Sequence, residues 1–337
     1  MTVLLDHPAR RWFGLAAIVA VAVIAALASL GIGSLDIAPQ VVIDSFLAPP
    51  EGREEIIVQQ LRVPRTVIGI AAGAVFALSG AVMQALTRNP LADPGLLGVT
   101  AGASLAVLAA LELFGIREPA RNLWFAFGGA AAAGLLVYGL GSAGRGGASP
   151  IKLAIAGAAL AAALGAVSTI LLSLSSRSLD EMRFWLVGSI AGRPLDVFWA
   201  VAPFVVVGSI LALLLGRPLN SLALGEEVAV SLGMRVGLVR AAAGTLVVVL
   251  AGAGVAMAGP IAFVGLAVPH IARVLVGPDW RWILPYSFVI GAVLLVVADT
   301  VGRIVVKPDE LQVGVIVALV GAPFFVALIR RRKLVAL

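Results

Sequence analysis

The chain of 337 residues contains no cysteine and very little charge. The absence of cysteine excludes disulfide bonds, thiolate metal sites and a cysteine nucleophile. Only two histidines are present, His7 and His270, and their wide separation argues against a metal site built on them. Charged residues make up 12% of the chain, whereas a soluble domain carries about a quarter. The composition therefore excludes an ordinary soluble domain.

The sequence also lacks the phosphate-binding loop G-x-x-x-x-G-K-[ST]. We therefore expect the chain itself to bind no nucleotide, and its residues indicate no other cofactor. Its motifs provide neither a Ser/His/Asp set nor a set of metal ligands. We predict that the chain is not itself an enzyme.

Apolar residues dominate the sequence: they make up 61% of the chain, and the mean hydropathy is +1.09. A helix that crosses a membrane needs about 20 apolar residues. The sequence therefore predicts an all-α membrane protein of about ten transmembrane helices, in a single domain over residues 1–337. The span at 260–276 is short, so we expect it not to cross at full depth. The predicted spans lie near residues 12–33, 62–86, 93–113, 121–141, 150–174, 194–215, 238–258, 260–276, 282–305 and 311–330.

The distribution of charge predicts how the chain is oriented. Its net charge is +6. If the N-terminus is cytoplasmic, the inner segments hold 14 basic and five acidic residues, and the rest of the chain holds 10 basic and 13 acidic residues. This split follows the positive-inside rule, so the basicity reflects topology and predicts no nucleic-acid partner. We expect both termini in the cytoplasm, and we expect the first span to be retained rather than cleaved as a signal peptide.

Residues 61–100 contain a predicted span with a specific polar patch at each end. Arg62 and Arg65 flank Pro64 before the span. Two further patches follow the span, Arg88-Asn89-Pro90 and Asp93-Pro94-Gly95. A helix that only had to lie in lipid needs none of these residues. We therefore expect the ends of this helix to have a function.

Motifs spread along most of the chain resemble those of one family. They are residues 61–100, Gly225-Glu226-Glu227, and residues 259–270, 298–303 and 314–323. In this order they resemble the permeases of type II ABC importers, which take up ferric siderophores, haem and cobalamin. The resemblance implies a multi-pass protein of the cell (inner or plasma) membrane with three kinds of partner. These are two ABC ATPase subunits that bind ATP and Mg, a second permease subunit (the same chain or a paralogue), and a substrate-binding protein.

The resemblance leaves the substrate open among iron chelates, haem and cobalamin. We expect a ferric siderophore, because that is the commonest assignment in the family. An alternative of another class is an ion-coupled secondary transporter or channel, which needs a cluster of acidic or polar groups near the membrane midplane. The predicted spans are nearly free of ionisable groups, and Asp299 lies close to the outer end of its span. This pattern favours the ATP-driven importer.

The segment at residues 217–237 is predicted to lie in the cytoplasm between the sixth and seventh spans. Within it, LGEEVAVSLGM places Leu224, Val228 and Leu232 at helical spacing beside a charged face, and Gly233 is a natural helix stop. The resemblance implies a coupling helix that lies in a groove of the ATPase. The alternative is a solvated amphipathic connector. The coupling role would involve Gly225, Glu226, Glu227, Ala229, Leu232 and Gly233.

Three arginines are predicted near the outer face: Arg62, Arg65 and Arg303. The resemblance implies that they meet acidic residues on the two lobes of the substrate-binding protein. A guanidinium suits this role because it is always charged and binds carboxylates through two hydrogen bonds. Two alternatives remain open. The arginines could reach lipid headgroups, and Arg303 could pair with Asp299, four residues before it on the same helix.

The resemblance also implies a cytoplasmic gate. Asn89 and Leu91 match family positions that narrow the pathway after the second span. The matching run between spans four and five is Ser149-Pro150-Ile151, which departs from the family's serine- and threonine-rich pattern. We therefore expect closure here to depend more on apolar contact than on hydrogen bonding.

Overall fold

The computed structural model describes residues 5, 7–50, 52–143, 150–174, 182–183 and 185–330. All regular structure within these residues is helical, which confirms the predicted fold class. In this part of the chain, seven helices are long and apolar enough to cross a membrane, and α5, α13 and α15 are shorter apolar helices. The helices at the predicted spans are α1 (Pro8–Gly31), α4 (Val63–Thr87), α5 (Val99–Phe114), α6 (Pro119–Ser142), α7 (Pro150–Leu174), α9 (Leu195–Leu214), α12 (Val236–Ala258), α13 (Val264–Val276), α14 (Trp280–Val305) and α15 (Val313–Arg330).

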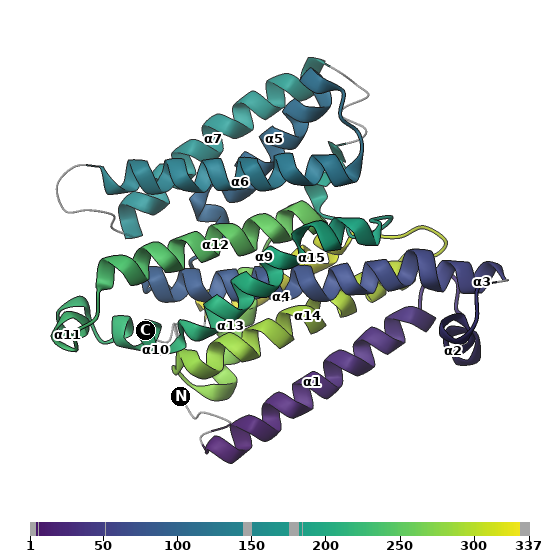
Figure 1. Ribbon diagram of the computed structural model, residues 1–337, viewed down its shortest axis with the longest axis horizontal. Coiled ribbons are helices and arrows are strands. Elements are labelled where there is room, and N and C mark those ends of the chain that lie inside the picture. Colours follow the sequence, from purple (N-terminus) through teal and green to yellow (C-terminus); the bar gives the residue numbers. More distant parts are fainter. Residues whose placement is uncertain are drawn as a thin grey trace.

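Shorter elements connect these helices at the two ends of the bundle. One end, where α1 ends and α4 begins, carries short helices before α4 (Figure 1). We call it the arginine end. The opposite end carries the connection between α9 and α12 (Figure 1). We call it the α11 end. The short elements are α2 (Pro39–Leu47), α3 (Arg53–Ile56), η1 (Ile57–Arg62), η2 (Pro94–Leu97), α10 (Gly216–Ala223) and α11 (Glu226–Ser231).

Helix α4 lies at the centre of the bundle and packs against α9, α12, α13 and α14 (Figure 1). Small residues allow these helices to approach closely, which matters in a membrane because lipid supplies no hydrophobic force between helices. A Cβ atom added to Gly73 of α4 would lie 2.8 Å from the carbonyl carbon of Gly291 in α14. Helices α5, α6 and α7 pack together beside α12, and α1 packs along α14.

Helix α13 begins only at Val264, because residues 259–263 before it are not helical. Residues 259–263 connect α12 to α13 in an irregular conformation in which Gly259 and Phe263 have φ values of 69° and 68°. Gln84 of α4 is fully buried and donates hydrogen bonds to the carbonyl oxygens of Gly265 and Leu266, both at 3.2 Å. These bonds satisfy backbone groups that lipid could not. At 13 residues, α13 is about 20 Å long, shorter than the hydrocarbon core of about 30 Å. That it does not cross at full depth stays a prediction.

Candidate functional site

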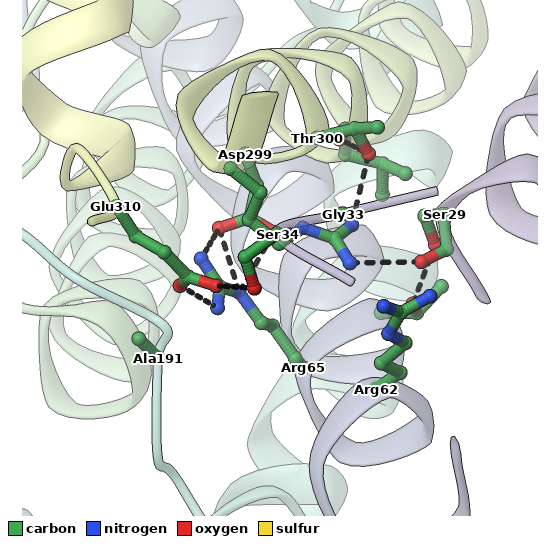
Figure 2. Close-up of polar contacts among 12 residues, drawn as sticks. Ser29, Gly33, Ser34, Arg62, Arg65, Ala191, Asp299, Thr300 and Glu310 are labelled. Carbon is green, nitrogen blue, oxygen red and sulfur yellow. Dashed lines mark hydrogen bonds and ion pairs between the residues drawn. The ribbon is translucent and has the colours of Figure 1, made fainter. Parts of the chain in front are cut away.

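Five charged side chains meet at the arginine end, and we call them the arginine cluster: Arg62, Arg65, Asp299, Arg303 and Glu310 (Figure 2). They come from η1, the first turn of α4, the end of α14 and the loop at residues 306–312. The packing of α4 against α14 brings these distant parts of the sequence together. The three arginines predicted to act together therefore lie together.

Arg65 lies between two carboxylates that differ in exposure (Figure 2). On one side, its Nε lies 2.9 Å and 2.8 Å from the two carboxylate oxygens of Asp299, and its Nη2 lies 2.8 Å from Oδ1. On the other side, its Nη1 lies 2.6 Å from Oε2 of Glu310. The side chains of Asp299 and Glu310 are 4% and 32% exposed. Arg65 thus joins a buried acid to an accessible one.

Glu310 lies outside the spans, in the loop after α14. Its Oε1 accepts a hydrogen bond from the hydroxyl of Ser34 at 3.2 Å. Partial burial opposes its ionisation, but the hydrogen bond and the charge of Arg65 outweigh burial and lower the pKa of Glu310. Glu310 is therefore an anion at neutral pH.

Arg62 and Arg303 hold the end of α1. Arg62 donates to the carbonyl oxygen of Leu30 at 2.7 Å and to that of Leu35, and Arg303 donates to the carbonyl oxygen of Ser29 at 2.9 Å. The last carbonyls of a helix lack partners within the helix and attract cations. Both arginines are buried, at 5% and 3% exposure. Both arginines bind the protein's own backbone in this structure, and the alternative that they reach lipid headgroups stays untested.

The predicted pairing of Arg303 with Asp299 is confirmed, because Nε of Arg303 lies 3.3 Å from Oδ2 of Asp299. Arg303 also donates to the hydroxyl of Thr300 at 3.0 Å. Docking of a partner on the three arginines stays a prediction, since the structure holds one chain. Its geometry nevertheless separates Arg65, which contacts the accessible Glu310, from the two arginines engaged with α1.

The segment at residues 217–237 contains α11, which the spacing predicts, and most of α10, which it does not predict. Gly225 and Gly233 have φ values of 117° and 80° and bracket α11, so each supplies a backbone conformation that other residues rarely adopt. Ala229 is fully buried, whereas Glu226 pairs with Arg240 of α12 at 2.9 Å. Glu227 is exposed.

The apolar residues of α11 and its flanks point out of the protein. Leu224, Val228 and Leu232 are 66%, 43% and 65% exposed. Helix α11 lies at one end of the bundle, beside the start of α12 (Figure 1). An exposed apolar patch of this kind indicates an interaction surface.

A polar contact that the sequence did not predict joins α10 to α14. Asn220 donates to Oδ1 of Asp279 at 2.6 Å and accepts from the backbone N–H of Trp280 at 2.9 Å. Asp279 also caps the start of α14 and pairs with Arg281 at 2.7 Å. Burial would raise the pKa of Asp279, but its hydrogen bonds to Arg281 and Asn220 lower that pKa to about 2. These contacts join α10, the helix before α11, to the start of the α14 span.

The described residues of the predicted gate lie at the α11 end, where α4 ends and α7 begins. Asn89 is exposed, and its Oδ1 accepts a hydrogen bond from the backbone N–H of Leu91 at 3.0 Å. Ser149 lies outside the described residues. Pro150 is the first residue of α7, and Ile151 is 73% exposed. Their role as a gate stays a prediction.

Three of the motif segments singled out in the sequence line one groove. Its volume is about 890 Å³, and it lies between η2, residues 260–262 and α15. The wall is mostly apolar, as at Leu186, Ile261 and Leu319, with Asp93 as a charged group on it. A groove of this size and character fits a bulky organic molecule rather than a bare ion.

Comparisons with known proteins agree with the geometry. The chain is 44% identical over 310 residues to the ferric enterobactin transport system permease protein FepD of Escherichia coli, covering 92% of each chain. It is 41% identical over 289 residues to the cobalamin import system permease protein BtuC of Halobacterium salinarum, covering 84% of this chain and 76% of that protein.

Its structure superimposes on a solved metal-chelate type ABC transporter in an inward-facing conformation with a TM-score of 0.80 and 29% identity, covering 94% of this chain and 98% of the other. Residues 21–331 match the model of the FecCD transport family. The chain therefore belongs to the FecCD transport family, the membrane-spanning permeases of ABC importers.

Proposed function

We propose that this chain moves a ferric siderophore across the cell membrane, as one of two permease subunits that work with two ATPase subunits and a substrate-binding protein. The observation that carries the substrate class is the mostly apolar groove of about 890 Å³. The similarity to the ferric enterobactin permease supports iron-chelate transport, since it is higher in identity and in coverage than the similarity to the cobalamin permease. Cobalamin is the second candidate, and haem is a further alternative within the same family.

The acids found within the spans argue against an ion-coupled transporter. Asp299 is neutralised by Arg65 and Arg303 near the end of α14. Asp196 lies in the first turn of α9, and Glu112 lies in the last turn of α5. A proton or ion relay needs such groups in series near the midplane. None of these three acids lies in that position. ATP hydrolysis on a partner subunit supplies the driving force instead.

The partner ATPase would bind the exposed apolar residues of α11. The residues proposed for this coupling are those predicted from the sequence, and the exposure of Leu224, Val228 and Leu232 supports it. Burying these three side chains against a groove removes apolar surface from water, at about 25 cal/mol per Å². With the α11 end on the cytoplasmic side, both chain termini would also be cytoplasmic, as the positive-inside pattern predicts.

Reconstituted transport tests this function. In liposomes, the permease with its ATPase and binding protein should accumulate ferric siderophore only when ATP is present. Leu232→Asp should reduce ATP-driven uptake at least about tenfold by weakening ATPase assembly, because it places a charge in an apolar interface. Leu47→Asp, at a 79% exposed position of α2 at the opposite end of the bundle, is the control for an added charge and should leave assembly with the ATPase unchanged.

Three results would contradict parts of the proposal. Uptake driven by an ion gradient without ATP would exclude an ABC importer. ATP-driven uptake of cobalamin or haem, with no uptake of ferric siderophores, would keep the class but change the substrate. Hydrolysis of ATP by the purified permease alone would show that the chain binds nucleotide itself.

The gate can be tested by crosslinking across the permease dimer. We propose that Asn89, Leu91 and the run Ser149-Pro150-Ile151 approach their counterparts when the pathway is closed to the cytoplasm. The exposure of Asn89 and Ile151 supports this. Since the chain has no cysteine to remove, Asn89→Cys and Pro150→Cys give clean probes. Each should form a dimer crosslink in one nucleotide state and lose it in another. Equal crosslinking in every state, or none, would show that these loops are not the gate.

A further inference from the structure

We propose that Glu310 holds Arg65 in place of a partner's carboxylate, and that an acidic side chain of the docking substrate-binding protein displaces it. The inference rests on the proposed function, since it requires a binding protein at the arginine end. It assigns the exchange to Arg65 and Glu310, and it gives Arg62 and Arg303 a different role.

The geometry around Arg65 allows one of its two ion pairs to exchange while the other stays. The buried side of the guanidinium, Nε and Nη2, is bound by Asp299, whose side chain is 4% exposed. The outer nitrogen, Nη1, is bound by Glu310, whose side chain is 32% exposed. A new carboxylate can therefore take the place of Glu310 without uncovering Asp299.

Apart from its ion pair with Arg65, the Glu310 side chain is weakly held. Within the described part of the chain, its other hydrogen bond comes from Ser34, a residue that is itself exposed. The loop is fixed nearby by the backbone bond from Leu311 to Gly302 at 3.0 Å and by the exposed pair of Lys307 with Asp36 at 3.1 Å. The Lys307–Asp36 pair is exposed, and such pairs contribute about 0–1 kcal/mol. Because the backbone bond between Leu311 and Gly302 also fixes the loop, the Glu310 side chain can rotate outward while the loop stays in place.

A cavity beside these groups provides room for the incoming side chain. Its volume is about 350 Å³, and Arg62, Arg65, Arg303 and Glu310 contribute to its lining. Leu35 and Leu61 also line it and are 43% and 54% exposed, so apolar surface accompanies the charge. Arginine is enriched at protein–protein interfaces, and more than half of a typical interface area is apolar.

The charge of the cluster selects an acidic partner. Three guanidinium groups face two carboxylates, so the cluster is positive overall, and departure of Glu310 would leave it more positive still. Buried or half-buried positive charge without a counter-ion is unfavourable. A carboxylate from outside restores the balance that Glu310 provides. Arg62 and Arg303 cannot exchange partners in the same way, because they hold carbonyl groups at the end of α1 and are 5% and 3% exposed.

The test compares two variants that each remove one negative charge at the arginine end. Glu310→Gln removes the competitor on Arg65, whereas Asp36→Asn removes an acid that pairs with Lys307 instead. Binding of the purified cognate substrate-binding protein is measured on permease in nanodiscs, at low and high salt. Glu310→Gln should bind about threefold to fivefold more tightly than the unaltered chain, and the gain should shrink at high salt. Asp36→Asn should change binding less than twofold.

A double-mutant cycle shows whether the gain in binding from Glu310→Gln acts through Arg65. Arg65→Gln should weaken binding about tenfold or more, and Glu310→Gln should give no gain in that background. The melting temperature of each variant shows whether it is folded. If Arg65→Gln does not fold, the comparison of binding between Glu310→Gln and Asp36→Asn still tests the inference. Equal or weaker binding by Glu310→Gln relative to Asp36→Asn would overturn the inference. If the unaltered permease binds no such protein, the proposed function itself fails.

Discussion

Replacing Asp299 by alanine is expected to destabilise the folded permease by about 3–5 kcal/mol. Asp299 is 3% exposed and bridges Arg65 and Arg303, at 2.8 Å and 3.3 Å. Without it, buried guanidinium groups remain in the protein with less counter-charge, which costs more than the ion pairs contribute in the intact protein. The thermal unfolding of the purified protein in detergent should shift to clearly lower temperature.

Asp36→Asn provides the control for this result. Asp36 also lies at the arginine end and pairs with Lys307, but its side chain is 72% exposed. An exposed pair contributes about 0–1 kcal/mol, so the unfolding temperature should hardly change. If Asp299→Ala were as stable as Asp36→Asn, the arginine cluster would not hold α1, α4 and α14 together.

Replacing Gly73 by valine is expected to disrupt the packing of α4 on α14. A Cβ at this position would lie 2.8 Å from the carbonyl carbon of Gly291 and 2.9 Å from Cβ of Leu295. The first of these is backbone, which cannot rotate out of the way, so the two helices must separate. Overpacking in a core costs about 1–3 kcal/mol, and a forced helix displacement at the centre of the bundle should reach or exceed the upper value. The amount of monodisperse protein and its unfolding temperature should both fall.

The matched control is Gly128→Val in α6. Gly128 is also inside an apolar helix, but a Cβ added to it would meet nothing within 4 Å. Both variants change the intrinsic helix propensity equally, so their difference reports the contact alone. Equal stability of the two variants would mean that α4 and α14 do not approach as closely as described.

Local sequence features were sufficient to predict the helices and the shape of the α11 region. Hydrophobic runs of about 20 residues predict spans because each helix satisfies its own backbone hydrogen bonds in lipid. Leu224, Val228 and Leu232 share one side because the helical period is local, and Gly225 and Gly233 mark the ends for the same reason. The short α13 was predicted from the short apolar run at residues 260–276. Motif resemblance gave the family, which the comparisons confirm.

The roles of the arginines depended on tertiary structure. Arg65 is 234 residues from Asp299 and 245 from Glu310, and the sequence pattern contains no signal that pairs them. The same holds for Asn220 and Asp279, which are 59 residues apart. Such contacts exist only once α4 has packed against α14, and α10 against the start of α14.

The sequence by itself determined that this chain is a bundle of membrane helices of a known transport family, with most charged residues near the helix ends. Tertiary structure decided what each of those polar residues does. Arg62 and Arg303 became partners of the α1 carbonyl groups because the end of α1 lies beside them, whereas Arg65 faces an acid that is open to exchange. The physical reason is that apolar burial and helix periodicity act over a few residues. The environment of a charge, in contrast, is set by whichever segments packing brings within a few ångströms of it.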